Sequence, residues 1–186
     1  MPAARKLRSG KCGIMAVIQE TDAGGDMKSL VVYYSLTGKT RLAAQAIAET
    51  LNAPLVEIRE TKPRKSGPSM YAIGGFEAKM NKGSKIDPID VDLKQYEKIF
   101  IGSPIWNSRP VPAINSFIYQ TNLEGRSIIP FFTMAGDNAE KALANITAKI
   151  ERSRGKVAGS FAITSYKVSD EAIVAKAKEA TKKFSS

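Results

Sequence analysis

The stretch of this sequence best suited to chemistry is a short run of hydroxyl-bearing and small residues, Ser35-Leu-Thr-Gly-Lys-Thr40. It follows an apolar run, Leu30 to Tyr34, and precedes a helical pattern that begins with Arg41. The first amides of a helix lack internal partners and carry the positive end of its dipole, so a loop delivered onto them forms an anion site. The hydroxyl groups add donors, and Gly38 lets the backbone come close to a ligand. The stretch therefore predicts a phosphate-binding loop between a strand and a helix.

The end of this loop, Gly38-Lys-Thr40, also mimics the end of a nucleoside-triphosphate P-loop. That motif requires a glycine five positions before Gly38, and Tyr33 stands there. A nucleoside-triphosphate site is therefore not expected.

Two further loops of unusual composition follow apolar strands. Pro104 to Arg109 comes after one strand, and Thr133 to Asn138 comes after the next. In an open parallel sheet, ligands bind beyond the carboxyl ends of the strands, where the strand order reverses. We therefore expect all three loops to border one site.

Several reaction classes are excluded by composition. The 186 residues include no histidine and a single cysteine, Cys12. A hydrolase that relies on histidine is excluded, a zinc site nearly so, and no internal disulfide can form. This cysteine usage fits a reducing cytosol, so we expect a cytoplasmic protein.

The formal net charge of +10 is concentrated near the end of the chain, where ten Lys or Arg residues from Lys141 onward face four acidic ones. A basic surface attracts nucleic acid, anionic membrane or acidic proteins. No aromatic residues are interleaved with these lysines as a single-strand binder requires, so a solvated helix face is the favoured interpretation and no nucleic-acid partner is expected.

Apolar runs and helical patterns alternate from Lys28 onward, which predicts an α/β fold: a doubly wound, five-stranded parallel sheet with helices on both faces. The expected strands are Ser29 to Tyr34, Pro54 to Ile58, Glu97 to Ser103, Ser127 to Thr133 and Lys156 to Ile163. The expected helices are Thr40 to Leu51, Pro112 to Thr121, Asn138 to Arg154, and a last one capped by Ser169 that reaches about Phe184.

Two segments depart from this alternation. Residues 1–27 are expected to be a disordered extension, with Met15 or Met27 as alternative starts, and residues 28–186 a single domain. An irregular insert at about 60–92 is too long for an ordinary connection. Within it, Tyr71 to Met80 could form a short helix, although Gly74 and Gly75 weaken that prediction and favour a flexible joint.

The three loops resemble those of the flavodoxin family over roughly Lys28 to Phe184. Tyr-Ser-Leu-Thr-Gly-Lys-Thr40 is similar to the family's phosphate loop, Ile99-Phe-Ile-Gly-Ser-Pro-Ile-Trp106 to its second loop, and Ile129-Pro-Phe-Phe-Thr-Met-Ala-Gly136 to its third. The resemblance implies the strand order 2-1-3-4-5 and non-covalently bound FMN.

It also implies roles for individual residues. The phosphate would be held by Ser35, Leu36, Thr37, Gly38, Lys39 and Thr40. The isoalloxazine ring would be bordered on one side by Pro104, Ile105, Trp106 and Asn107, and on the other by Thr133, Met134, Ala135, Gly136 and Asp137. For Asp137, capping of the next helix is an equal alternative.

Three functions stay open at this point. The leading one is an FMN-binding, flavodoxin-like redox protein that passes electrons to protein partners, acidic ones included, or to a small acceptor. The second is a small NAD(P)H-dependent FMN quinone or flavin reductase, which would make the chain an FMN-dependent oxidoreductase. The third is a binding module that uses the basic face from Lys141 to Lys183. Unlike typical flavodoxin carriers, the chain is basic and has Met134 and Ala135 where a stacking tyrosine is usual.

Overall fold

Five parallel strand positions form the centre of the molecule, as predicted. The computed structural model describes residues 28–64 and 68–185, so the prediction for the N-terminal extension lies outside the described residues. The strand order is β2-β1-β3-β5-β6, with β7 also paired to β5, and all of these neighbours run parallel. The strands are β1 (Ser29–Tyr33), β2 (Leu55–Glu57), β3 (Lys98–Trp106), β5 (Ser127–Met134), β6 (Lys156–Val157) and β7 (Phe161–Thr164).

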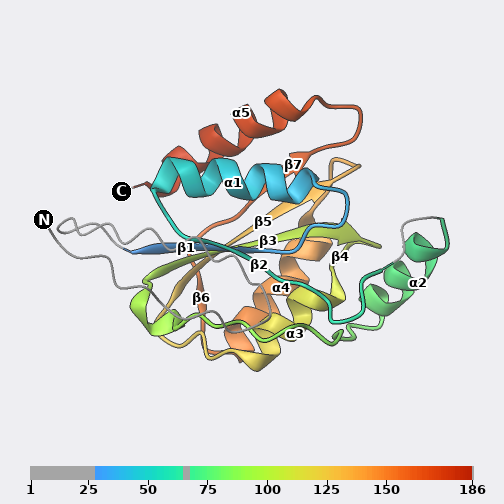
Figure 1. Cartoon of the computed structure of the whole chain (residues 1–186), viewed down its shortest axis with the longest axis horizontal. Coiled ribbons are helices and arrows are strands. Elements are labelled where there is room, and N and C mark those ends of the chain that lie inside the picture. The colour runs from blue at the N-terminus through green and yellow to red at the C-terminus, as the bar shows by residue number, and fades with distance from the viewer. Residues whose placement is uncertain (1–27, 65–67, 186) are drawn as a thin grey trace, which may run out of the picture.

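Helices cover both faces of this sheet (Figure 1). On one face lie α1 (Lys39–Leu51) and α5 (Asp170–Thr181), which the 3-10 turn η2 (Lys182–Phe184) extends. On the other lie α3 (Pro112–Gln120) and α4 (Glu140–Arg152). The fold class predicted from the sequence is confirmed.

Strand residues alternate between two apolar layers, because successive side chains of a strand point to opposite faces. On β1, Leu30 and Val32 are buried against the α3 and α4 side, whereas Val31 packs with Ile47 of α1 and Ile173 of α5. Residues at the centres of both layers are fully buried, so each central strand packs on both of its faces.

The outermost strand differs from the prediction, which had one strand from Lys156 to Ile163. Val157 pairs with Ile128 and Phe161 with Phe131, so four steps on the outer strand match three on β5. The extra residue forms a bulge that separates β6 from β7. Gly159 lies in this break, where an added Cβ would stand 2.5 Å from the ring of Phe184.

The third strand is also longer than predicted. It continues to Trp106, and the chain then turns back into β4 (Arg109–Pro110), which pairs antiparallel with it. Asn107 and Ser108 have φ values of 48° and 58°, the positive pair that a two-residue type I′ hairpin needs. Pro104 to Pro110 is therefore a hairpin and not an irregular loop.

The insert contains the predicted helix, which begins three residues earlier as α2 (Pro68–Lys79), and a 3-10 turn, η1 (Leu93–Gln95). Figure 1 shows α2 beside the end of the sheet where the strands finish. Gly74 and Gly75 are buried within this helix, so the flexible joint predicted there is wrong. Across the part of the chain that the structure describes, no helix has the length and apolar character to cross a membrane.

Candidate functional site

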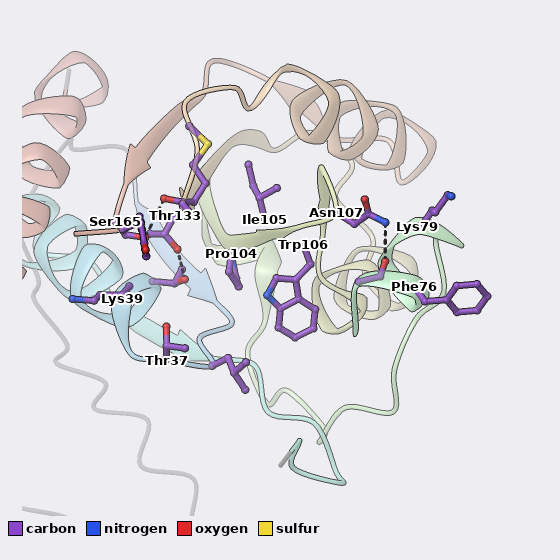
Figure 2. Close-up of a pocket in the computed structure, with 16 residues that line it drawn as sticks. Thr37, Lys39, Phe76, Lys79, Pro104, Ile105, Trp106, Asn107, Thr133 and Ser165 are labelled. Atoms are coloured by element: carbon purple, nitrogen blue, oxygen red, sulfur yellow. Dashed lines mark hydrogen bonds between the residues drawn. The ribbon is translucent and has the colours of Figure 1, made fainter. Parts of the chain in front are cut away.

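A cavity of about 750 Å³ opens at the carboxyl ends of the central strands. Figure 2 shows the indole of Trp106 between the β1–α1 loop, with Thr37, and the helix α2, with Phe76. The structure brings the three predicted loops together here. Eleven predicted residues line the cavity: Leu36, Thr37, Lys39, Thr40, Pro104, Ile105, Trp106, Asn107, Thr133, Met134 and Ala135.

The β1–α1 loop forms an open cradle at the start of α1. Gly38 is the N-cap, with φ at 88°, and no side chain caps the helix. The first turn holds no acidic residue that would compete for an anion. The Oγ of Ser35 is buried and has no hydrogen-bond partner among the described residues. Because a buried hydroxyl without a partner is unfavourable, this atom indicates that a ligand oxygen binds at the loop and supplies the missing hydrogen-bond partner.

Two side chains at the start of α1 are tied to neighbouring elements. The hydroxyl of Thr40 is buried and shares a 2.7 Å hydrogen bond with the hydroxyl of Thr133 at the end of β5. The ammonium of Lys39 forms a 2.7 Å ion pair with Asp170, the first residue of α5. The cradle therefore offers amides and hydroxyls more than a free cation, which suffices for a phosphate at a helix N-terminus.

Trp106 is the aromatic wall of the cavity, and contacts on several sides hold it. Its ring and that of Tyr34 lie at an angle of 88° with their centroids 6.2 Å apart, and the Arg64 guanidinium carbon lies 5.3 Å from the centre of the indole. A Cβ on Gly74 would come within 2.7 Å of the indole, so only glycine lets α2 pack this closely. These contacts set the orientation of the indole.

An ionic network supports this wall from behind. Glu60 accepts two hydrogen bonds from Arg64, at 2.7 and 2.8 Å, and one from the hydroxyl of Tyr34 at 3.0 Å. Arg64 also pairs with Glu77 of α2 at 2.8 Å. Burial and the Glu60 carboxylate raise the pKa of Tyr34, so its hydroxyl stays a donor. The network joins the start of the insert to α2 and to the end of β1.

The structure adds five lining residues that the sequence did not place at the site: Gly75, Phe76, Lys79, Ser165 and Tyr166. Ser165 and Tyr166 follow β7, whose carboxyl end lies at the same edge of the sheet as those of the other parallel strands. Because ligands bind beyond the carboxyl ends of such strands, the position of these two residues after a strand could have identified them. The α2 residues carry no local signal of this kind, because their position depends on how the insert folds back.

Four predicted residues do not line the cavity: Ser35, Gly38, Gly136 and Asp137. Ser35 and Gly38 shape the phosphate loop from within it. Gly136 accepts a 3.3 Å hydrogen bond from the hydroxyl of Thr164 through its carbonyl, and Asp137 is exposed. It is Asn138, and not Asp137, whose side chain accepts from the amide of Glu140 at the start of α4.

Comparison with known proteins agrees with this geometry. A flavodoxin model matches residues 28–170. The chain belongs to the flavodoxin family. The family that the three loops indicated is thus confirmed. A comparison with curated proteins gives no significant match.

Solved structures share the fold of this flavodoxin-family chain. A solved structure from Bacteroides uniformis is 24% identical, with a TM-score of 0.68 over 83% of this chain and 99% of that one. A flavoprotein of Lactobacillus acidophilus in complex with FMN is 24% identical, with a TM-score of 0.65 over 81% and 97%. A flavodoxin from the domain Archaea is 16% identical, with a TM-score of 0.54 over 86% and 96%.

The residues present fit FMN, and the family assignment supports FMN as the cofactor, as predicted. The unpartnered hydroxyl of Ser35 and the uncapped start of α1 suit its phosphate. The apolar and aromatic wall around Trp106 suits a planar ring. Among the described residues, no group of His, Cys, Asp or Glu side chains could hold a metal ion.

Proposed function

We propose that this chain binds FMN in the cavity beside Trp106 and transfers electrons through the bound flavin. The observation that carries the proposal is the phosphate cradle at one end of a cavity large enough for the ring. When bound, the flavin supplies the electron-transfer chemistry. The task of the protein is to hold the cofactor and shield it from water.

Each of the three loops has a distinct part in this proposal. Ser35, Thr37 and the first amides of α1 hold the phosphate. Trp106, fixed by Tyr34 and Arg64, borders the ring on one side. Thr133, Met134 and Ala135 border it on the other and bring no second aromatic stack. We propose that the remaining predicted residues complete this site: Leu36, Gly38, Lys39 and Thr40 at the phosphate, Pro104, Ile105 and Asn107 beside the ring, and Gly136 and Asp137 in the loop after β5, outside the cavity wall.

An FMN titration of the purified full-length protein tests the proposal. Ser35→Ala combined with Thr37→Ala should weaken FMN binding about tenfold or more, because hydrogen bonds to a charged group are each worth about 1.5–3 kcal/mol. The same change should leave the unfolding temperature of the FMN-free protein nearly unchanged, since the Ser35 hydroxyl has no partner there. Thr50→Ala, at the far end of α1, is the matched control and should bind FMN normally. Protein that stays colourless and binds no FMN overturns the proposal.

A second candidate, an NAD(P)H-dependent reductase, is favoured by the wall that α2 adds to the cavity. Phe76 of α2 is 59% exposed and lines the cavity beside the predicted loops, a position open to a small molecule. A carrier requires a protein reductase, whereas a reductase is reduced by NADPH alone. The absorbance of the FMN-loaded protein with NADPH, without oxygen, separates the two functions.

A further inference from the structure

A second cavity, of about 520 Å³, lies next to the first and shares Lys79 and Asn107 with it. Figure 2 shows both shared residues at the α2 side of the first cavity, which we call the flavin cavity. The second cavity is bordered by the end of α2, the β3–β4 turn and the start of α4, with Ser108, Arg109, Lys141 and Asn145 in its wall. We call it the basic cavity.

Three cations, Lys79, Arg109 and Lys141, line the basic cavity. Within residues 28–64 and 68–185, none of them forms an ion pair with a carboxylate. Arg109 instead donates to the amide oxygen of Asn81 at 3.1 Å. The positive charge in this wall is therefore not neutralised by any carboxylate of the described residues.

A buried lysine behind the wall adds a fourth cation. Lys149 of α4 is 3% exposed and donates to the side-chain oxygens of Asn115 at 2.7 Å, Asn81 at 3.1 Å, and Asn145. All three partners are neutral amides. Burial, together with the charges of Arg109 and Arg152, lowers the pKa of Lys149 to about 8. These cations have no counter-charge paired with them in the described part of the chain. An anion in the basic cavity would offset the repulsion between them and favour the charged form of Lys149.

We propose that the basic cavity binds the phosphate groups of a nicotinamide dinucleotide. The nicotinamide end of this ligand would pass Lys79 and Asn107, which line both cavities, and reach the flavin cavity. Arg and Lys side chains that converge without acidic partners are suited to phosphate. A ligand that spans both cavities needs an anionic part at one end and a planar ring at the other, and a dinucleotide has both. The inference rests on the proposed FMN function and names the small-molecule partner of that site.

Adenosine 2′,5′-bisphosphate is the probe, because it carries nucleotide phosphates but no reactive ring. Calorimetric titration of the full-length protein at constant ionic strength should show binding, with or without FMN. Arg109→Gln and Lys141→Gln should each weaken it about tenfold or more, since charged hydrogen bonds are lost. Lys176→Gln removes the same charge from the exposed side of α5, on the opposite face of the sheet, and should change nothing.

Equal binding by all variants, or no binding by the wild type, overturns the inference. Inorganic phosphate in a parallel titration distinguishes a general anion site: if it binds as tightly as the bisphosphate, the dinucleotide assignment is wrong. NADPH should compete with the bisphosphate. FMN titration of the same preparations separates the two proposals, because loss of bisphosphate binding with intact FMN binding refutes only this inference. Absence of FMN binding refutes the proposed function itself.

Discussion

The position of Trp106 depends on one glycine. Residues 74 and 75 are both buried glycines in α2, but only Gly74 faces the indole, where a Cβ would lie 2.7 Å from the ring. A Cβ on Gly75 would meet only the Cβ of Asn107, at an ordinary 3.8 Å. Since glycine is unfavourable inside a helix, its presence at 74 is explained by this close approach.

Gly74→Ala should therefore destabilise the protein and move the indole, with Gly75→Ala as the matched control. Alanine improves helix propensity at either position by about 1 kcal/mol, but at 74 the clash with a packed ring costs about 1–3 kcal/mol. Urea unfolding should show a loss of stability for Gly74→Ala and a neutral or stabilising effect for Gly75→Ala. The fluorescence of Trp106, the only tryptophan, should shift only in the first variant. The same response in both variants contradicts this account.

Trp106 could be placed at the site from the sequence, but the role of Gly74 and Gly75 could not. The resemblance of the second loop, which follows a predicted strand and runs from Pro104 to Pro110, predicts Trp106 at the site, and Trp106 does line the cavity. Gly74 and Gly75 were predicted as a joint, because composition shows only that glycine weakens a helix. The contact that stabilises this glycine-containing helix comes from a residue over 30 positions away, and no local pattern encodes it.

At the scale of elements, the insert at about 60–92 forms one wall of the cavity through its helix α2. At its start, Glu60 accepts hydrogen bonds from Arg64 and from the hydroxyl of Tyr34 beside β1, and its later part is docked on α3. There Asn115 donates to the carbonyl of Lys82 at 3.0 Å, and Ser116 to that of Ser84. Hydrogen bonds before and after α2 thus connect the insert to the rest of the domain.

Replacing Arg64 should show how much this anchoring contributes. Arg64→Met leaves the carboxylate of Glu60, which is 5% exposed, without its cation, and removal of one partner from a buried pair costs about 3–5 kcal/mol. Arg59→Met is the control, because its pair with Glu57 is 59% exposed on the arginine side and such pairs are worth about 0–1 kcal/mol. Urea denaturation measures both. If Arg64→Met costs no more than Arg59→Met, the network does not anchor the insert.

The elements themselves were largely predictable, because strand and helix periodicities are local. The strands and helices from Ser29 to Thr181 were found within a few residues, and Ser169 caps α5 through a 3.3 Å bond to the amide of Ala172, as predicted. The bulge between β6 and β7 and the hairpin at Asn107 were not found. Both depend on pairing between strands, and a sequence window does not contain that information.

At the scale of the whole molecule, the sheet order gathers the ends of separate strands at one edge. The β1–α1 loop and the end of β5 are 93 residues apart, yet the hydroxyls of Thr40 and Thr133 meet there. A ligand in the cavity at this edge would contact α1, α2 and the ends of β3 and β5, because residues of all four line the cavity. Such a ligand binds only the folded domain, so its binding raises the free energy of unfolding. The stability of the protein should therefore show whether the phosphate cradle binds an anion.

FMN should therefore raise the unfolding temperature far more than riboflavin, the same ring without a phosphate. At about 100 times its Kd, FMN adds about 2.7 kcal/mol to the stability of the folded state. In a domain of this size about 1 kcal/mol corresponds to a shift of about 2–4 °C, so a rise of about 5–10 °C is expected. Riboflavin at the same concentration should give less than half of it, because the Ser35 hydroxyl and the α1 amides would stay without an anion. Scanning calorimetry of the full chain measures both. Equal rises would show that the cradle does not hold the phosphate, and no rise with either would refute flavin binding.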